Sequence, residues 1–240
     1  MTVRQTANPA LILLTSGALS ACGTVRSGFE VSAPSAIPPA LHGEIDERGR
    51  TTLRLDGIDL RVDVRNRLTQ RKVFGWGIVP FLPGVVPFIT SDTLGDPSRP
   101  LVIFFELHPR EPGFSFEPMA IRIRRDRALR DLTPRGFVGP GRPSEQRCLD
   151  ATGRELEEQA VSETFELAPD QHGTCFVLAF RAPSPTVIGF RLFLKGLLRG
   201  LDPIDLQEMR FEKRTGRATV PLGPHEDWVP AAFRPEADPR

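Results

Sequence analysis

A strict alternation of apolar and polar residues on both sides of Asp56-Gly57 constrains the fold of this chain more than any other feature. Leu53 and Leu55 precede the dipeptide, and apolar residues occupy every second position from 58 to 64 after it, with charged residues between them. Because successive side chains on a β-strand point to opposite faces, each run has one apolar and one polar face. Asp-Gly tolerates the positive φ angles of a tight hairpin turn. The sequence therefore predicts a β-hairpin that covers a core with one face.

Apolar runs farther along the chain predict more strands. The run 101–107 is apolar except at Glu106, which is typical of a central strand buried on both faces. Pro118 interrupts a later alternation and predicts a bulge or an edge. The other candidates are 114–116, 121–123, 163–167, 175–180, 187–194, 206–211 and 217–222, with a turn at Thr215-Gly216. Only 154–160 could form a short helix, so we expect an all-β fold: an antiparallel β-sandwich, or a barrel-like single domain.

The net charge and the aromatic content of the chain exclude some classes of binding partner. If residues 1–21 are removed, Arg4 is lost and 30 basic residues remain against 30 acidic ones. A neutral chain has no long-range field that gathers polyanions, so we expect no nucleic-acid partner. The chain has 16 Phe, two Trp and no Tyr. Because Phe lacks a polar tip, this content favours a well-filled core over an aromatic recognition surface.

The amino terminus has the order of a secretory signal. Arg4 is followed by the short apolar run 10–14 and then by small residues before Cys22. The apolar run is far shorter than the roughly 20 residues that cross a hydrocarbon layer. The stretch Leu19-Ser20-Ala21-Cys22 resembles the lipobox of bacterial lipoproteins. This resemblance covers only the first two dozen residues of the chain.

The lipobox resemblance implies a diacylglyceryl thioether on Cys22, cleavage after Ala21, and acylation of the new amino terminus, for example by palmitate. Two or more acyl chains anchor a protein stably to a membrane. Gly23, where some lipoproteins have Asp, implies transport to the outer membrane, with the protein facing the periplasm. We therefore expect a lipid-anchored protein of the cell envelope; the alternative is a secreted protein with a chance cysteine at position 22.

The composition divides the chain into four parts. Residues 1–21 form the signal peptide, and residues 22–40, rich in Gly, Ser and Pro, predict a lipidated cysteine followed by a flexible tether. The β-sandwich domain is expected over 41–222, before a Pro-rich carboxyl-terminal tail over 223–240. Residues 133–146 are also rich in Gly and Pro and predict a long loop or a boundary between two sheets or subdomains; of these arrangements we prefer one domain.

Two cysteines remain once Cys22 is assigned to lipid. These are Cys148 and Cys175, and the expected compartment is oxidising. An even number of cysteines in such a compartment predicts a disulfide between them. The alternative is two buried free thiols. Neither belongs to a Cys-x-x-Cys pair, so a thioredoxin-like redox role has no support.

Residues 73–89 form the most unusual segment of the chain. These 17 residues carry no charge and include three prolines and three glycines, from which we expect an irregular backbone. One interpretation is a structural loop that plugs the end of the sandwich. The other is an exposed surface that contacts an envelope protein or a membrane, with Trp76, Phe81 and Phe88 as its candidate residues.

Other candidate sites carry weaker signals. Arg122 and Arg124 are expected on one strand face, where they could bind a phosphate group, or simply lie in solvent and pair with neighbouring acids. The histidines have no metal-ligand spacing, and Glu155, Glu157 and Glu158 are expected in water. The sequence contains no nucleophile elbow, phosphate loop or dinucleotide motif. We assign no catalytic residue, metal or cofactor. The four histidines considered are His42, His108, His172 and His225.

These observations support two hypotheses on function. The first is a lipid-anchored, non-enzymatic interaction or structural module that makes contact through residues 73–89. The second is an envelope hydrolase, or a glycan- or lipid-binding protein, with its site on loops at one end of the sandwich. The second hypothesis predicts that His108 or His172 lies beside two carboxylates with perturbed pKa values.

Overall fold

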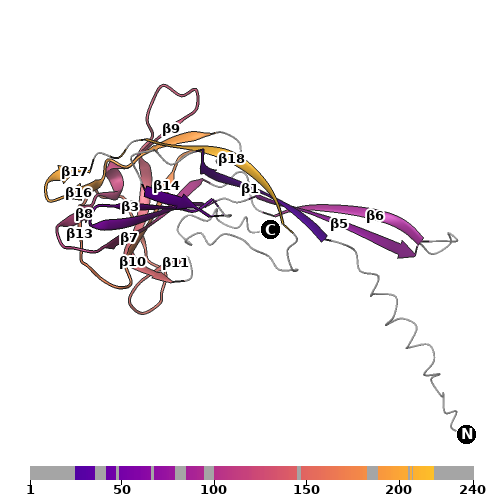
Figure 1. Ribbon diagram of the computed structural model, residues 1–240, viewed down its shortest axis with the longest axis horizontal. Helices are drawn as coiled ribbons and strands as arrows, with labels where there is room; N and C mark the ends of the chain where they lie inside the picture. Colours follow the sequence, from indigo (N-terminus) through magenta and orange to yellow (C-terminus); the bar gives the residue numbers. More distant parts are fainter. Residues whose placement is uncertain are drawn as a thin grey trace, which may run out of the picture.

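A computed structural model describes residues 25–35, 42–46, 49–65, 68–78, 85–94, 100–144, 147–182, 189–204, 206 and 208–218. Over 25–32, 66–99 and 214–218 the description is restricted to the backbone of the strands. The described chain is an all-β sandwich of antiparallel sheets, as predicted (Figure 1). The sheets are open, so the barrel-like alternative does not apply to this part of the chain.

The largest sheet has eight strands and contains the predicted hairpin. Its order is β11-β10-β14-β7-β4-β3-β2, with β12 paired to β10. Gly57 has φ +79° in the turn between β3 and β4, and Leu55 pairs with Ile58, which confirms the prediction for Asp56-Gly57. The bounds are β2 His42–Ile45, β3 Thr51–Leu55, β4 Ile58–Arg65, β7 Leu101–Pro109, β10 Pro134–Ser144, β11 Arg147–Leu149, β12 Glu158–Gln159 and β14 Thr174–Phe180.

Two further sheets complete the sandwich. The six-stranded sheet has the order β6-β5-β1-β18-β15-β9, and the four-stranded sheet has the order β13-β8-β16-β17. A 3₁₀ turn, η2 (Pro118–Ala120), separates β8 from β9 at the proline that interrupts the sequence pattern. The bounds are β1 Val25–Pro34, β5 Leu68–Ile78, β6 Val85–Leu94, β8 Phe114–Phe116, β9 Arg122–Arg125, β13 Phe165–Leu167, β15 Phe190–Phe193, β16 Leu197–Arg199, β17 Asp202–Pro203 and β18 Met209–Ala218.

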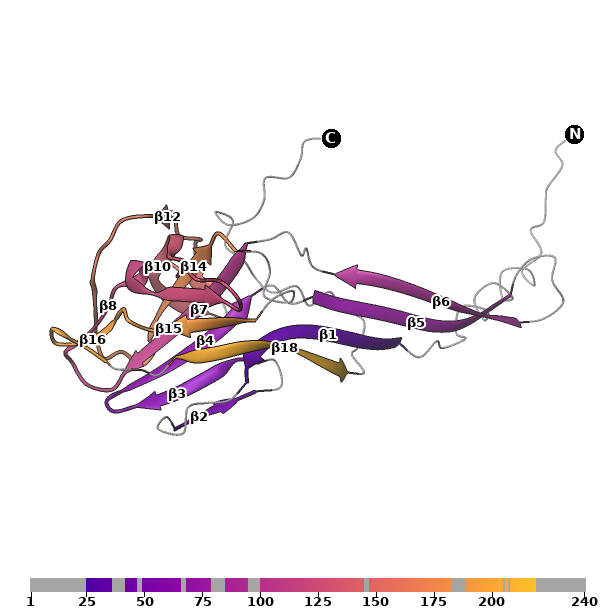
Figure 2. The ribbon, with the colours of Figure 1, turned by 90° about the horizontal axis from the view of Figure 1, so that it is seen from above.

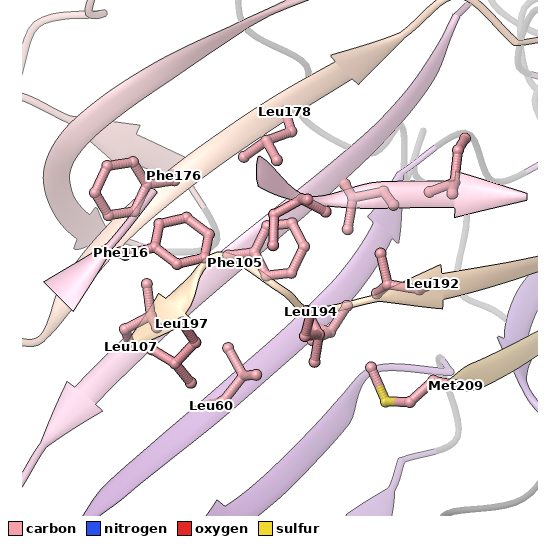
Figure 3. Packing of buried hydrophobic residues seen from close by; sticks show 14 of the residues in the cluster. Leu60, Phe105, Leu107, Phe116, Phe176, Leu178, Leu192, Leu194, Leu197 and Met209 are labelled. Atoms are coloured by element: carbon pink, nitrogen blue, oxygen red, sulfur yellow. The ribbon is translucent and has the colours of Figure 1, made fainter. Parts of the chain in front are cut away.

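Phenylalanine fills the core between the sheets. Strand β7 is buried on both faces, as predicted, and its Phe105 ring lies 5.7 Å from the Phe116 ring of the four-stranded sheet (Figure 3). Phe116 in turn lies 4.9 Å from Phe176 on β14, and Phe190 stacks on Phe211 at 4.8 Å in the six-stranded sheet. All five side chains are at most 1 % exposed. Burial of these rings supplies much of the apolar driving force for folding.

The Cys148–Cys175 disulfide is present and joins β11 to β14, so the alternative of two free thiols is wrong. Both sulfurs belong to a smaller apolar cluster on the opposite face of the eight-stranded sheet from the main core. Phe104 of β7 and Val177 of β14 are also in this cluster, and Leu156 packs against it.

Two segments that were expected to be loops are strands. Residues 25–34, assigned to a flexible tether, form β1, which pairs with β18 on one side and β5 on the other. Residues 133–146 were predicted as a loop or boundary, but 134–144 form β10, paired with β14. The ladder accommodates its Gly and Pro residues through register shifts, one of them across Gly139-Pro140. Proline lacks an N–H group, and such irregularities are where a sheet tolerates it.

Two local predictions also fail. The short helix over 154–160 is absent; this stretch is extended, with a bridge between Leu149 and Glu155 and the two residues of β12. The turn at Thr215-Gly216 is also absent, because β18 runs straight through both residues and pairs them with Glu30 and Phe29 of β1. In both places, strand pairing overrides the local preference.

Candidate functional site

Strands β5 and β6 form a long hairpin that projects from the body of the sandwich, as two perpendicular views show (Figures 1 and 2). The hairpin contains most of the uncharged segment 73–89. The expectation of an irregular backbone is therefore wrong for 73–78 and 85–89, which pair in continuous register. Strands 73–78 and 85–89 also lead away from the sandwich, which does not fit the interpretation of a structural loop that plugs its end (Figures 1 and 2).

The position of β6 explains how a strand can include proline. In the described part of the chain, β6 pairs only with β5 and is the edge of its sheet. An edge strand has one side without ladder hydrogen bonds, so Pro87 can be accommodated there without breaking the sheet. The prolines of 73–89 therefore exclude a central strand but not an edge strand such as β6.

The hairpin register sorts the candidate contact residues onto two faces. Trp76 pairs with Pro87, and Phe88 pairs with Gly75, so Trp76 and Phe88 lie on opposite faces in adjacent rows. Phe81 lies outside the described residues. The face that includes Trp76, called the Trp76 face below, is entirely apolar over the outer half of the hairpin (Val73–Ile78 with Val85–Thr90): it consists of Phe74, Trp76, Ile78, Val85, Pro87 and Ile89.

Basic residues border the outer half of the hairpin. Lys72 pairs with Ser91 on β6 and with Arg26 on β1, so two cations lie directly opposite each other. Arg217 of β18 pairs with Gly28, two residues from Arg26, and so lies on the same face. This face is also the Trp76 face, because Lys72 and Trp76 are four residues apart on one strand. No local sequence pattern predicts this group of cations, since only strand pairing brings Arg26 and Arg217 to the hairpin.

Arg122 and Arg124 lie on β9, on the face opposite the buried Ile123. Nη1 of Arg122 donates to the carbonyl oxygens of Met119 and Ile121, at 2.5 and 2.9 Å. Nε of Arg124 donates to the Asp131 carboxylate at 2.6 Å, and this hydrogen bond lowers the pKa of Asp131. Both guanidinium groups therefore donate hydrogen bonds to acceptors within the protein. This agrees with the alternative interpretation, in which the arginines lie on a solvated sheet face and Arg124 pairs with a neighbouring acid.

A second polar cluster lies across β4 and β7. Arg61 donates to Glu106 at 2.8 Å, and His108 Nε2 lies 2.7 Å from the other carboxylate oxygen. Burial favours the neutral form of Glu106, but the His108 hydrogen bond and the nearby Arg61 charge outweigh it, and the pKa of Glu106 is lowered. A carboxylate with a lowered pKa is a weak general base near neutral pH. The cluster therefore resembles a structural ion pair more than the acid–base site of the hydrolase hypothesis.

The remaining candidates are dispersed. His42 and His172 are exposed, and the clustered Glu155, Glu157 and Glu158 face solvent, with Glu158 3.8 Å from Arg135. Among the described side chains, no group of three or more His, Cys, Asp or Glu could hold a metal ion. Within the described ranges, no helix has the length and apolar character needed to cross a membrane. His225 and Cys22 lie outside the described residues.

The projecting hairpin is therefore the feature that most distinguishes this sandwich as a site. It combines an uncharged outer half with a basic border. No protein-family model, curated protein or solved structure matches this chain.

Proposed function

We propose that this protein is a lipid-anchored, non-enzymatic interaction or structural module of the cell envelope. Acyl chains on Cys22 would hold it at the periplasmic face of the outer membrane. Its contact element would be the hairpin over 73–89. The observation that carries the proposal is the uncharged outer half of the hairpin, which extends beyond the sandwich (Figure 2).

The physical argument concerns the cost of exposed apolar surface. Soluble proteins rarely present large contiguous apolar patches unless another surface covers them. The outer half of the hairpin contains no charged residue in either strand, and its edge strand β6 has an unpaired side in the described structure. Such an edge is also a liability, which proteins usually reduce by placing charges on it. Retaining an apolar edge is consistent with a surface that has a partner.

Two further features support a location in the envelope. The Cys148–Cys175 disulfide suits an oxidising compartment. The lipobox residues 19–22 supply a means of attachment. By contrast, the hydrolase hypothesis requires two carboxylates with perturbed pKa values beside a histidine, and His108 contacts one such group, Glu106, whose lowered pKa suits an ion pair.

Photocrosslinking in living cells tests the contact element. A photoreactive residue at Trp76 or Phe88 should give a discrete adduct with a protein or a lipid. Arg61 is the matched surface control, because it lies on the sandwich body with its side chain 44 % exposed. The absence of any adduct above this control at both hairpin positions would refute the hairpin as a contact element.

Labelling with palmitate tests the anchor separately. The wild-type chain should incorporate labelled palmitate and resist extraction from membranes by alkaline carbonate. Cys22→Ala should lose the label and become extractable. Label retained in Cys22→Ala would show that Cys22 is not the lipidation site.

A further inference from the structure

We infer that the outer half of the β5–β6 hairpin binds the membrane itself: it lies in the interface of the leaflet that holds the acyl chains of Cys22, with its Trp76 face toward those chains. The inference rests on the proposed function, because it takes Cys22 to be lipidated. Three observations carry it: the short chain between Cys22 and β1, the direction of β1, and the charges at the border of the hairpin.

The first observation is the length of chain between the lipid and the sheet. Cys22 lies three residues before Val25, the first residue of β1. Three residues extend at most about 10 Å. Val25 pairs with Val73, where the outer half of the hairpin begins. A lipid on Cys22 therefore holds the start of this outer half within about 10 Å of the anchored residue, since no long tether intervenes.

The second observation is the direction of the strands. Strand β1 is antiparallel to β5, so β1 runs from the outer half of the hairpin toward the body of the sandwich. The chain that precedes Val25 thus leaves β1 on the side toward which β5 continues. Residues 73–78 extend about 17 Å beyond that point, at roughly 3.3 Å per residue. The acyl anchor and the outer half of the hairpin are consequently on the same side of the protein.

The third observation is the order of residues on the Trp76 face. Its six apolar positions are followed, toward the body, by the cations Lys72, Arg26 and Arg217. Like charges directly opposite each other, as in the Arg26–Lys72 pair, destabilise a sheet unless anions offset them. Anionic lipid headgroups supply such charge, and apolar residues beside basic ones are typical of a surface that lies in the membrane interface.

Register relates the Trp76 face to the core-facing side of the six-stranded sheet. Pro34 of β1 pairs with Phe211 of β18, whose side chain is in the core. Alternation along β1 places Arg26, and through it Lys72 and Trp76, on that same core-facing side of the sheet. The hairpin itself extends beyond the end of the sandwich (Figure 2).

The open edges of the hairpin set the depth of insertion. Backbone N–H and C=O groups without partners are costly in hydrocarbon, and β6 has an unpaired side in the described part of the chain. A two-stranded hairpin can satisfy these groups only in the hydrated headgroup zone. We therefore expect the apolar face to reach roughly 5–10 Å into the headgroup and acyl boundary, and not to span the membrane.

Fluorescence of Trp76 measures this insertion directly. The chain has two tryptophans, so Trp228→Phe leaves Trp76 as the only reporter. The acylated protein is reconstituted into vesicles of phosphatidylethanolamine and phosphatidylglycerol that carry bromine on their acyl chains. Trp76 should be blue-shifted and quenched by the brominated chains. Unquenched Trp76 in the anchored protein would overturn the inference.

Matched substitutions on the two faces test the orientation. The mature chain with Cys22→Ser lacks the anchor and reports binding by the hairpin alone. In this background, Ile78→Asp on the Trp76 face should lower partition into the same vesicles about tenfold or more, because the contribution from burying the Ile78 side chain is lost and a charge takes its place. Phe88→Asp on the opposite face should change it by less than about threefold. Equal losses in both variants would overturn the assigned orientation, provided that both retain the wild-type melting temperature.

The two proposals fail in different ways. A protein crosslink at Trp76 without quenching by brominated lipid would overturn membrane insertion but leave the hairpin as a contact element. Absence of both signals would overturn both proposals. Quenching together with lipid adducts would support both.

Discussion

Removing the disulfide tests how the sandwich is stabilised. The double variant Cys148→Ala/Cys175→Ala eliminates the covalent link between β11 and β14, and with it the restriction that the link places on the unfolded chain. For a sequence separation of 27 residues, the chain-entropy relation gives a loss of about 3.5 kcal/mol in the free energy of unfolding at 25 °C. Loss of two fully buried sulfurs from their apolar cluster adds to this value.

The corresponding change in melting temperature is measurable. A chain of this size loses about 2–4 °C per kcal/mol, so 3.5 kcal/mol predicts a decrease of about 7–14 °C. Thermal unfolding followed by circular dichroism compares the wild type, the double variant, and the wild type in reductant. Reduction should give about this loss, and substitution a somewhat larger one, because substitution also removes the two buried sulfurs. A decrease below about 3 °C in both would refute the reasoning that the disulfide contributes through the unfolded state.

Three further predictions concern the body of the sandwich. Phe176→Ala should lower the free energy of unfolding in urea by about 3–5 kcal/mol, because its fully buried ring contacts three other rings; a loss below about 1 kcal/mol would contradict this. Arg61→Met should raise the pKa of Glu106. Folding lowers the pKa of Glu106, so the Glu106 carboxylate stabilises the folded protein at pH values above its unfolded-state pKa of about 4.3. This stabilisation is lost as the pH falls through the pKa of the folded state. The deficit of Arg61→Met should therefore be largest at pH 7 and shrink below about pH 4, whereas a deficit independent of pH would contradict the ion pair. Gly57→Ala should lower the melting temperature, because Gly57 has φ +79° and an added Cβ would lie 2.9 Å from the buried Phe114 ring; an unchanged value would show that the turn adapts.

Predictions from sequence succeeded where the local pattern of apolar residues directly reflects which side chains are buried. The alternation around Asp56-Gly57 and the apolar run 101–107 both correspond to strands in the eight-stranded sheet. An alternating strand buries one face, whereas a continuously apolar strand buries both. In these segments, the residue types alone predict which side chains contact the core. The disulfide was predictable for a simpler reason, because only two cysteines remained to pair.

Predictions failed where distant strands supply the hydrogen bonds. Residues 25–34 and 134–144 have the Gly and Pro content of loops, yet β18, β5 and β14 pair with them. Local composition does not reveal a partner that lies more than a hundred residues away, as β18 does from β1. Pro87 was misjudged for the same reason, since its tolerance depends on its place at a sheet edge.

The sequence by itself determined that this chain is an antiparallel β-sandwich with a phenylalanine-rich core, because alternation and apolar content are properties of short segments. It also determined that residues 73–89 carry no charge. Only the tertiary structure decided that residues 73–78 and 85–89 pair in a projecting hairpin, that Trp76 and Phe88 occupy opposite faces, and that cations from three strands border it. The physical reason is that strand pairing depends on which distant segments can share a ladder and a core. That choice is a property of the whole chain.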